Sequence, residues 1–243
     1  MGLAAIMWQE YVYFKRKFWS ITLGSMISPV LYLIAFGWGL GGGMHGGGGD
    51  YINFIIPGIV GLTTMTASFS AIGNSINISR LYEKTFEEFM VAPLNMWVYA
   101  IGKVVAGAFR GLYSGWLIIL LALVFRTKID IHPYFVLMMV LNCLTFSAIG
   151  FTVGILIKSH ADMAKFSNFI ITPMAFLCGT FFPLAKMPFL LKNLIWLLPL
   201  TQTSLGLRSR GENIWNRTMH PLILVLYFGL VLVLGVHYCK KAE

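Results

Sequence analysis

The chain has 243 residues, of which 58% are hydrophobic and 11% are charged. An average soluble domain is about 45–50% apolar and about 25% charged, so this composition excludes an ordinary soluble globular protein. The net charge of +9 would suggest nucleic-acid binding in a soluble protein. In a membrane protein, basic residues instead report the orientation of the spans, so no nucleic-acid partner is expected.

The amino-terminal segment has the pattern of a helix that lies in the membrane interface. Apolar residues recur there at helical spacing, and polar ones lie mostly elsewhere. The apolar set is Leu3, Met7, Tyr11, Phe14 and Phe18, and the polar set is Gln9, Glu10, Lys15, Arg16 and Lys17. We therefore expect an interfacial helix over residues 1–18. A plain helical extension of the first span is the alternative, and both place the basic cluster beside lipid headgroups.

Apolar windows predict an all-α polytopic membrane protein with six transmembrane helices. A helix needs about 20 apolar residues to cross the hydrocarbon core. Five windows are clear and a sixth is shorter: residues 19–40, 52–76, 98–125, 134–157 and 220–238, and the shorter 166–182. The basic cluster at residues 15–17 favours cytoplasmic termini, although Arg126 and Lys128 would then lie outside. The whole chain, 1–243, is expected to form a single transmembrane domain.

A glycine-rich stretch at residues 37–49 does not match a phosphate-binding loop. A Walker A motif needs Gly-x-x-x-x-Gly-Lys-Ser/Thr, whereas here no Lys follows and Asp50 would repel an anion. We interpret the stretch as a flexible external connection. Since the motif occurs nowhere else in the chain, ATP-driven transport would require an ATPase on another polypeptide, and this chain would bind no cofactor itself.

The second span is unusually polar for a helix that faces lipid. Hydroxyls can bond the carbonyls of the preceding turn, which accounts for part of this set. Their density favours a helix that lines a dimer seam or a transport pathway, with these residues as candidates: Thr66, Ser68, Ser70 and Asn74. No acidic residue lies inside an expected span, which argues against coupling to protons or sodium ions.

The loop after the second span predicts a short amphipathic helix, within residues 79–92. One face holds the apolar residues Tyr82, Phe86, Phe89 and Met90, and the other holds Arg80, Glu83, Lys84, Glu87 and Glu88. Such a helix places its apolar face on the membrane domain. The charged face would dock a cytosolic partner, or, as the alternative, would merely be solvated.

Two features further along the chain concern packing and the outer side of the membrane. Gly107, Gly111 and Gly115 recur every four residues in the third span and favour close helix packing within the subunit. Arg110 lies among them and could reach the interface with its long side chain. Prolines divide residues 183–200 into pieces too short to span, so we expect this segment to dip into the membrane from outside without crossing.

Two sequence segments resemble a known family. Residues 83–94, followed by Gly102 and Lys103, are similar to the cytoplasmic-loop motif of ABC-2 type permeases, the membrane subunits of type V ABC exporters. Residues 176–183, Met187-Pro188 and residues 198–201 are similar to the second signature of that family. Its outer re-entrant residues here are Gly179, Pro183, Pro188 and Pro199. Lys84 departs from the family pattern, because many members carry Gly at this position.

The resemblance implies a permease in a bacterial-type inner membrane, paired with a second permease subunit as a homodimer or a heterodimer. Each subunit would rest on an ABC nucleotide-binding subunit that holds ATP and Mg²⁺, and the amphipathic loop helix would be the coupling helix. The expected function is export of an amphiphilic, lipid-linked, glycan or drug-like substrate from the cytoplasm.

A permease-like scaffold without transport and an intramembrane enzyme are the alternatives. The five histidines are scattered and form no cluster with Ser and Asp, which disfavours an enzyme. The three cysteines have no metal-ligand spacing, so we expect no metal site.

Overall fold

The computed structural model describes residues 2–35, 48–91, 95–124, 129–184, 188–209 and 214–241. Regular structure within these ranges is helical throughout. The long helices are α2 (Phe18–Tyr32), α3 (Gly48–Leu81), α5 (Met96–Val124), α6 (Pro133–Leu156) and α11 (Ile214–Lys241). The shorter ones are α1 (Gly2–Arg16), α4 (Thr85–Val91), α7 (His160–Phe166), the π-helix η2 (Ser167–Ile171), α8 (Thr172–Leu177), α9 (Phe189–Trp196) and α10 (Pro199–Arg208). Most of the expected glycine-rich connection at 37–49 lies outside the described residues.

Five helical segments of the described chain are long and apolar enough to cross a membrane. They are Phe18–Ala35, Asn53–Leu81, Met96–Val124, Pro133–Leu156 and Arg217–Lys241, and they coincide with five of the expected spans. The sixth expected span is not one long α-helix, because α7, η2 and α8 follow one another from His160 to Leu177. The wider turns of η2 and a proline in the first turn of α8 interrupt regular α-helical hydrogen bonding there.

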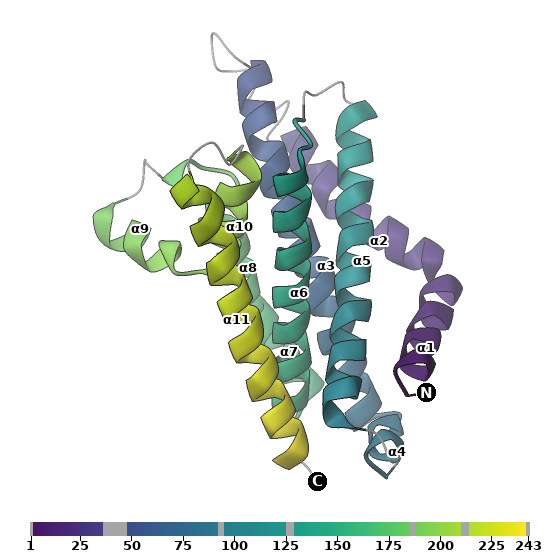
Figure 1. Cartoon of the computed structure of the whole chain (residues 1–243). Coiled ribbons are helices and arrows are strands. Elements are labelled where there is room, and N and C mark those ends of the chain that lie inside the picture. The colour runs from purple at the N-terminus through teal and green to yellow at the C-terminus, as the bar shows by residue number, and fades with distance from the viewer. Residues whose placement is uncertain are drawn as a thin grey trace.

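The long helices form a bundle around α3, α5 and α6. Figure 1 shows α11 beside α6, and α1 and α2 beside α5, in agreement with the contacts between these elements. Both chain termini and α4 lie at the same end of the bundle, which we call the α4 end. The chain therefore returns to the end from which it starts.

The central helices approach each other closely at glycines of α5 and α6. A methyl group on Gly111 would lie 1.8 Å from the Ser68 Oγ atom of α3, and one on Gly107 would lie 2.2 Å from the Ser147 Oγ atom of α6. A methyl group on Gly150 would lie 2.5 Å from the backbone oxygen of Phe69. The spaced glycines of α5 thus serve packing within the subunit, as the sequence predicts.

A buried amide joins three helices in the middle of the bundle. The Asn142 Nδ2 group of α6 donates to the Gly61 carbonyl at 3.0 Å and to the Thr64 hydroxyl at 2.9 Å, both on α3. The Thr203 hydroxyl of α10 donates to Asn142 Oδ1 at 2.8 Å. Because both donors and the acceptor of this side chain are satisfied, the buried amide fixes where α10 sits on α3 and α6.

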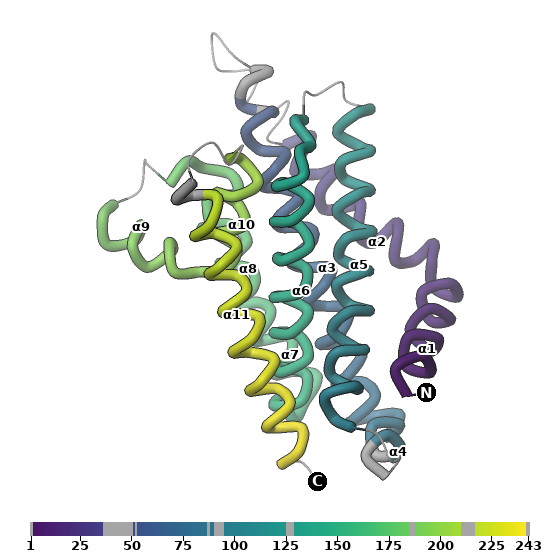
Figure 2. Tube along the Cα trace, viewed as in Figure 1, coloured from purple at the N-terminus to yellow at the C-terminus, as the bar shows by residue number. Residues whose placement is uncertain are grey.

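The segment before α11 leaves the bundle and returns to it at the end opposite α4. The chain turns at Gly179, whose positive φ of 74° suits glycine. In Figure 2, α9 begins away from the bundle and runs back toward it, where α10 follows; accordingly, Phe189 and Leu190 are exposed and Ile195 is buried. Pro188 precedes α9 and Pro199 is the first residue of α10, a position that tolerates proline. This helical segment extends beyond the expected 183–200, since α10 continues to Arg208 and most of its residues are buried; its re-entrant position in the membrane stays a prediction.

Side chains of α10 and α11 hold the carboxyl end of α9. Carbonyl groups at a helix end have no partner within the helix. Three of them accept hydrogen bonds here: Ile195 from Thr201, Trp196 from Gln202, and Leu197 from Tyr227. This arrangement gives a physical role to the residues that follow Leu198 and Pro199 in the second signature.

The coupling helix is shorter than the sequence predicts. Helix α3 continues to Leu81, residues 82–84 form a break, and α4 begins at Thr85. Lys84 lies in the break with a positive φ of 55°, a conformation that costs a residue with a side chain roughly 1–2 kcal/mol and costs glycine almost nothing. The position at which this chain departs from the family pattern is therefore the position where the backbone favours glycine.

Replacing Lys84 by Gly should stabilise the protein, because glycine adopts this backbone conformation without strain. For about 1 kcal/mol gained, the midpoint of thermal unfolding should rise by about 2–4 °C. The measurement is thermal unfolding in detergent. Lys84→Ala is the control, since it removes the same charge but keeps the strain, and an equal rise in both variants would show that the charge, not the backbone, is responsible.

Candidate functional site

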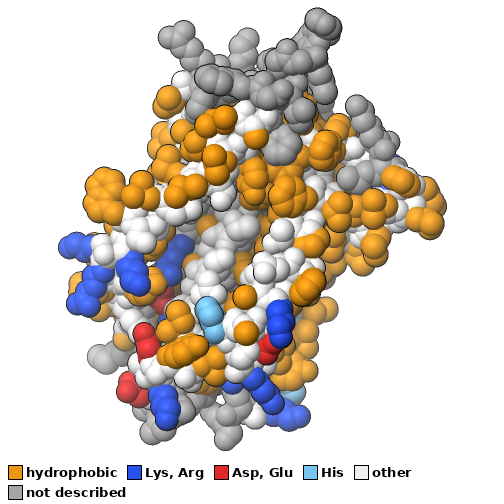
Figure 3. All heavy atoms as spheres, turned by 180° about the vertical axis from the view of Figure 1, so that it is seen from behind, with side chains coloured by type: hydrophobic (Ala, Val, Ile, Leu, Met, Phe, Trp, Pro, Cys, Tyr) orange, Lys and Arg blue, Asp and Glu red, His pale blue; other side chains and the backbone are white. Residues whose placement is uncertain are grey.

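A cavity of about 640 Å³ lies between α1, α2, α3 and α5 and extends to α4. Hydroxyl groups make up much of its wall: Ser20, Ser25, Ser28, Thr63, Thr66, Ser70, Ser75, Ser79, Thr85 and Ser114. Figure 3 shows the molecule from behind, where charged side chains gather in the lower half, toward the α4 end, and hydrophobic ones prevail above. The cavity therefore has a polar wall, and the outer surface of the bundle above the α4 end is largely apolar.

Three of the four polar residues predicted on the second span line this cavity. Thr66, Ser70 and Asn74 are spaced four residues apart and so share one face of α3. Ser68 is fully buried and faces α5, where its hydroxyl lies close to Gly111. The helical period thus separates Ser68 from the other three, and their role as a pathway or dimer seam stays a prediction.

The cavity contains a buried cluster of three charged residues, Glu10 of α1 and Lys103 and Arg110 of α5. The Lys103 Nζ atom lies 2.6 Å from Glu10 Oε1, and the Arg110 guanidinium donates to Glu10 Oε2. All three side chains are less than 10% exposed. One carboxylate therefore holds two cations and fastens α1 to α5.

Sequence reasoning missed the role of Glu10. It placed this residue on the polar side of an interfacial helix, and it treated Arg110 as a side chain that reaches the interface. A signal was present, because Lys103 and Arg110 are seven residues apart on one face of α5, and α5 contains no acidic residue. Two such cations require a carboxylate from another element, since unpaired charges are costly to bury.

Aromatic rings surround the two cations. The Arg110 guanidinium lies 4.6 Å from the centre of the Tyr13 ring, a distance that suits a cation–π contact. The Lys103 ammonium lies 5.9 Å from the Tyr99 ring and 6.0 Å from the Phe89 ring of α4. The charge cluster is therefore in contact with both the amino-terminal helix and the coupling helix.

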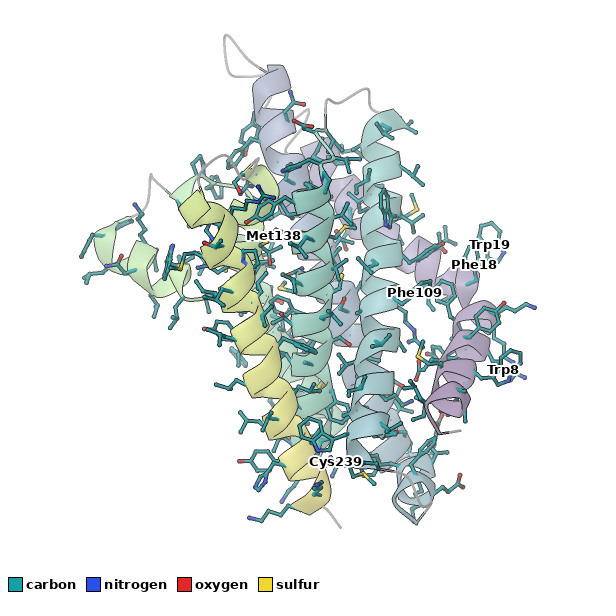
Figure 4. All side chains as sticks on the ribbon, viewed as in Figure 1. Trp8, Phe18, Trp19, Phe109, Met138 and Cys239 are labelled. Carbon is teal, nitrogen blue, oxygen red and sulfur yellow. The ribbon has the colours of Figure 1, made fainter. Side chains whose placement is uncertain are left out.

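Helices α1 and α2 meet at a break near Lys17 and present large aromatic residues outward. Trp8 and Trp19 are 66% and 73% exposed, and Figure 4 shows both pointing away from the bundle. On the inner side, the Thr22 hydroxyl is 2.9 Å from the hydroxyl of Tyr113 on α5. Exposed tryptophans are typical of a membrane–water interface, which agrees with the interfacial helix expected at residues 1–18.

The charged residues expected to contact an ATPase fall into two groups. Glu83, Lys84 and Glu88 are exposed at the α4 end. The side chain of Glu87 is outside the part of the chain that the structure describes. Arg80 lies on α3, not on α4, and its guanidinium donates to the Gly154 and Ile155 carbonyls at the carboxyl end of α6. This position satisfies the free carbonyls of α6 and complements its dipole, so Arg80 is bound within the subunit.

The apolar residues expected to anchor the coupling helix are also divided. Phe86 is 5% exposed and packs against Tyr99, with the ring centres 6.0 Å apart. Phe89 is half-buried, with its ring centre 5.3 Å from that of Tyr99. Tyr82 is 68% exposed because the break at residues 82–84 takes it off the axis of α4. The side chain of Met90 lies outside the described residues.

The end opposite α4 is closed by a cation that bonds to backbone carbonyls. Arg208 of α10 donates from Nε to the Phe54 carbonyl at 3.1 Å and from a terminal nitrogen to the Thr180 carbonyl at 3.0 Å. A methyl group on Gly58 would lie 2.4 Å from that Thr180 oxygen, so α3 and the turn after α8 are in close contact. The turn contains the signature residue Gly179, and the chain passes Pro183 before it reaches α9.

Among the described residues, no group of three or more His, Cys, Asp or Glu side chains could hold a metal ion. Cys143, Cys178 and Cys239 are buried, and they form no disulfide among the described residues. The polar groups of the cavity wall are mainly hydroxyl groups and one charge cluster.

Comparisons with known proteins agree with the architecture. The family model of the ABC-2 type transporter matches residues 1–210. The inner membrane transport permease YadH of Escherichia coli (strain K12) is 29% identical over 237 residues, which cover 95% of this chain and 89% of YadH. Nodulation protein J of Neorhizobium galegae is 26% identical over 246 residues, which cover 99% of this chain and 94% of that protein. No solved structure matches the chain.

The family match takes in every feature of the candidate site. It spans α1 with Glu10, the polar face of α3, helix α4 and helices α9 and α10. The apolar helices around them are those of a multi-pass membrane protein. This chain belongs to the ABC-2 type transporter family.

Proposed function

We propose that this chain is the membrane-spanning permease subunit of an ATP-binding cassette exporter. It would move an amphiphilic substrate, such as a lipid-linked molecule, a glycan or a drug-like compound, out of the cytoplasm. The observation that best supports this function is the polar cavity, which extends from the faces of α2 and α3 to the coupling helix α4. A substrate in this cavity would lie beside the element on which a cytosolic motor can act.

The energy would come from a separate subunit. The sequence contains no Walker A pattern, so ATP and Mg²⁺ would be held by a partner ATPase. Helix α4 fits the contact with that partner, because Phe86 holds it to the bundle while Glu88 is exposed. A push on α4 would reach the cavity through the contact between Phe89 and Lys103.

The proposed topology has six crossings with both termini in the cytoplasm of a bacterial-type inner membrane. The consecutive helices α7, η2 and α8 would together form the fifth crossing. After it, α9 and α10 would enter the membrane from the outer side. The position of both termini and α4 at one end supports an even number of crossings. The basic residues at 15–17 support a cytoplasmic amino terminus.

A second copy of the chain would complete the transport pathway. The cavity is bounded by helices of one subunit. Polar groups of α3 that faced lipid would lack hydrogen-bond partners unless another protein surface covered them. A homodimer is the simplest assembly that provides such a surface. A permease-like scaffold without transport is the alternative, and ATP-driven transport in vesicles distinguishes the two.

Reversing Glu87 and Glu88 to Lys should uncouple the subunit from its ATPase while leaving insertion and abundance intact. Each exposed charge contributes only about 1 kcal/mol, so the double reversal adds repulsion to the lost attraction. The measurements are co-purification of the ATPase and ATP-dependent movement of fluorescent amphiphiles in vesicles that hold both subunits.

The matched control is the double variant Lys240→Glu and Lys241→Glu. It also reverses two charges at the α4 end, but at the end of α11. We expect this control to keep association and transport. If the α4 variant also keeps both in full, α4 is a solvated loop helix and its assignment as the coupling element is wrong.

Cysteine labelling tests the topology with two exposed lysines. Lys192→Cys on α9 should react with an impermeant maleimide added outside intact cells, whereas Lys241→Cys should react only after the membrane is opened. The native cysteines are buried and give little background. Labelling of Lys192→Cys from the cytoplasmic side alone would contradict the proposed outer position of α9.

A further inference from the structure

The charge cluster in the cavity is not neutral. Three cationic groups line the cavity, Lys17, Lys103 and Arg110, against two carboxylates, Glu10 and Glu83. Among the buried groups, two positive charges face one negative charge, because Lys103 and Arg110 share the single carboxylate of Glu10. A positive charge that is held in a water-poor cavity without its own counter-ion favours an anionic ligand.

Arg110 retains the capacity to bind such a ligand. Within the described residues it donates one hydrogen bond, to Glu10, although a guanidinium has five N–H groups. Its face lies over the Tyr13 ring, so its edge is left for in-plane hydrogen bonds. A guanidinium edge matches the paired oxygens of a phosphate or carboxylate group.

The wall of the cavity contains a second unused polar group. The Thr63 hydroxyl of α3 lines the cavity, its residue is 3% exposed, and its oxygen has no hydrogen-bond partner among the described residues. Buried polar atoms nearly always have a partner. A ligand with oxygen acceptors would supply one for this hydroxyl.

We propose that this cavity binds the monoanionic headgroup of an amphiphile between Lys103 and Arg110, with hydroxyl groups of α3 completing the contacts. A phosphodiester is the simplest headgroup with this charge, and the excess of one cation in the cluster matches it. The ligand's apolar part would lie against the apolar residues of the same cavity, among them Ile21 and Pro29 of α2 and Leu62 of α3. A volume of about 640 Å³ is also larger than a free inorganic anion needs.

Binding at this position would change the contacts of the coupling helix α4. The ammonium of Lys103 contacts both Glu10 of α1 and the Phe89 ring of α4. An anion that competes with Glu10 for Lys103 and Arg110 would loosen α1 from α5 and change the surroundings of Phe89. That the bound amphiphile is transported cargo rests on the proposed function, whereas the binding itself does not.

The test variants change one of the two cations that share the Glu10 carboxylate. Lys103→Gln or Arg110→Gln leaves one cation paired with Glu10, so the cluster becomes neutral and α1 keeps an ion pair to α5. Lys103→Arg preserves the charge. Lys165→Gln is the matched control, because it removes an exposed lysine of α7 that pairs with Asp162 far from this cavity's charge cluster.

The experiment measures lipid retention by the purified full-length chain with native mass spectrometry. The probes are dioleoyl-phosphatidylglycerol, which is monoanionic, and dioleoyl-phosphatidylcholine, which has the same chains and no net charge. Inorganic phosphate is added as a competitor. The wild-type chain, Lys103→Arg and Lys165→Gln should prefer phosphatidylglycerol, and Lys103→Gln and Arg110→Gln should bind it at least about tenfold more weakly.

Two results would overturn the proposal. One is an unchanged preference for phosphatidylglycerol in both Gln variants, which would place the lipid elsewhere on the chain. The other is competition by inorganic phosphate at the same concentration as the lipid, which would make the site one for a free anion. Loss of the preference alongside intact ATP-driven transport would leave the proposed function standing, and retained binding without transport would contradict the proposed function alone.

Discussion

The contact of Glu10 with Lys103 and Arg110 determines how α1 and, through it, α2 are attached to the bundle. Breaking a buried ion pair by removing one partner costs about 3–5 kcal/mol, because a charge is left without compensation. Here one carboxylate pairs with two cations, so α1 cannot leave α5 without leaving both without a counter-ion. The position of α1 fixes the start of α2, and these two helices form one wall of the cavity. The cavity therefore exists because this cluster holds its wall in place.

The opposite wall depends on close packing and on one amide. Glycines of α5 and α6 let α3 approach until its backbone and hydroxyls touch its neighbours. This contact commits one face of α3, with Ser68, to the interior and turns the face with Thr66, Ser70 and Asn74 toward the cavity. Asn142 then ties α3 and α6 to α10. Moving the wall formed by α1 and α2 would break ion pairs, whereas moving the wall formed by α3 would disrupt close packing and the hydrogen bonds of Asn142.

Sequence patterns predicted the features that depend on helical periodicity. They failed for contacts between elements that are far apart in the sequence. Five spans, the shared face of Thr66, Ser70 and Asn74, and the burial of Phe86 follow from helical spacing and hydrophobicity. The same spacing continues through the break at residues 82–84, so periodicity could not show that Tyr82 and Arg80 lie outside α4. Glu10 was missed because its partners are about 100 residues away in the sequence and an isolated acidic residue on a polar helix face looks solvated. The bonds of α10 to the end of α9 likewise depend on tertiary contacts.

The two ends of the bundle compensate buried cations in different ways, and this difference bears on transport. At the α4 end, one carboxylate pairs with Lys103 and Arg110, and the proposed anionic ligand would take over one of these contacts. At the opposite end, Arg208 bonds to the carbonyls of Phe54 and Thr180, which belong to the backbone and which no ligand can replace in kind. Moving α10 away from α3 would break these bonds together with that of Thr203 to Asn142, at roughly 1 kcal/mol or more for each. Opening the end opposite α4 therefore breaks bonds that a ligand cannot replace, and in an exporter of the proposed kind this is a step at which energy from ATP would be needed.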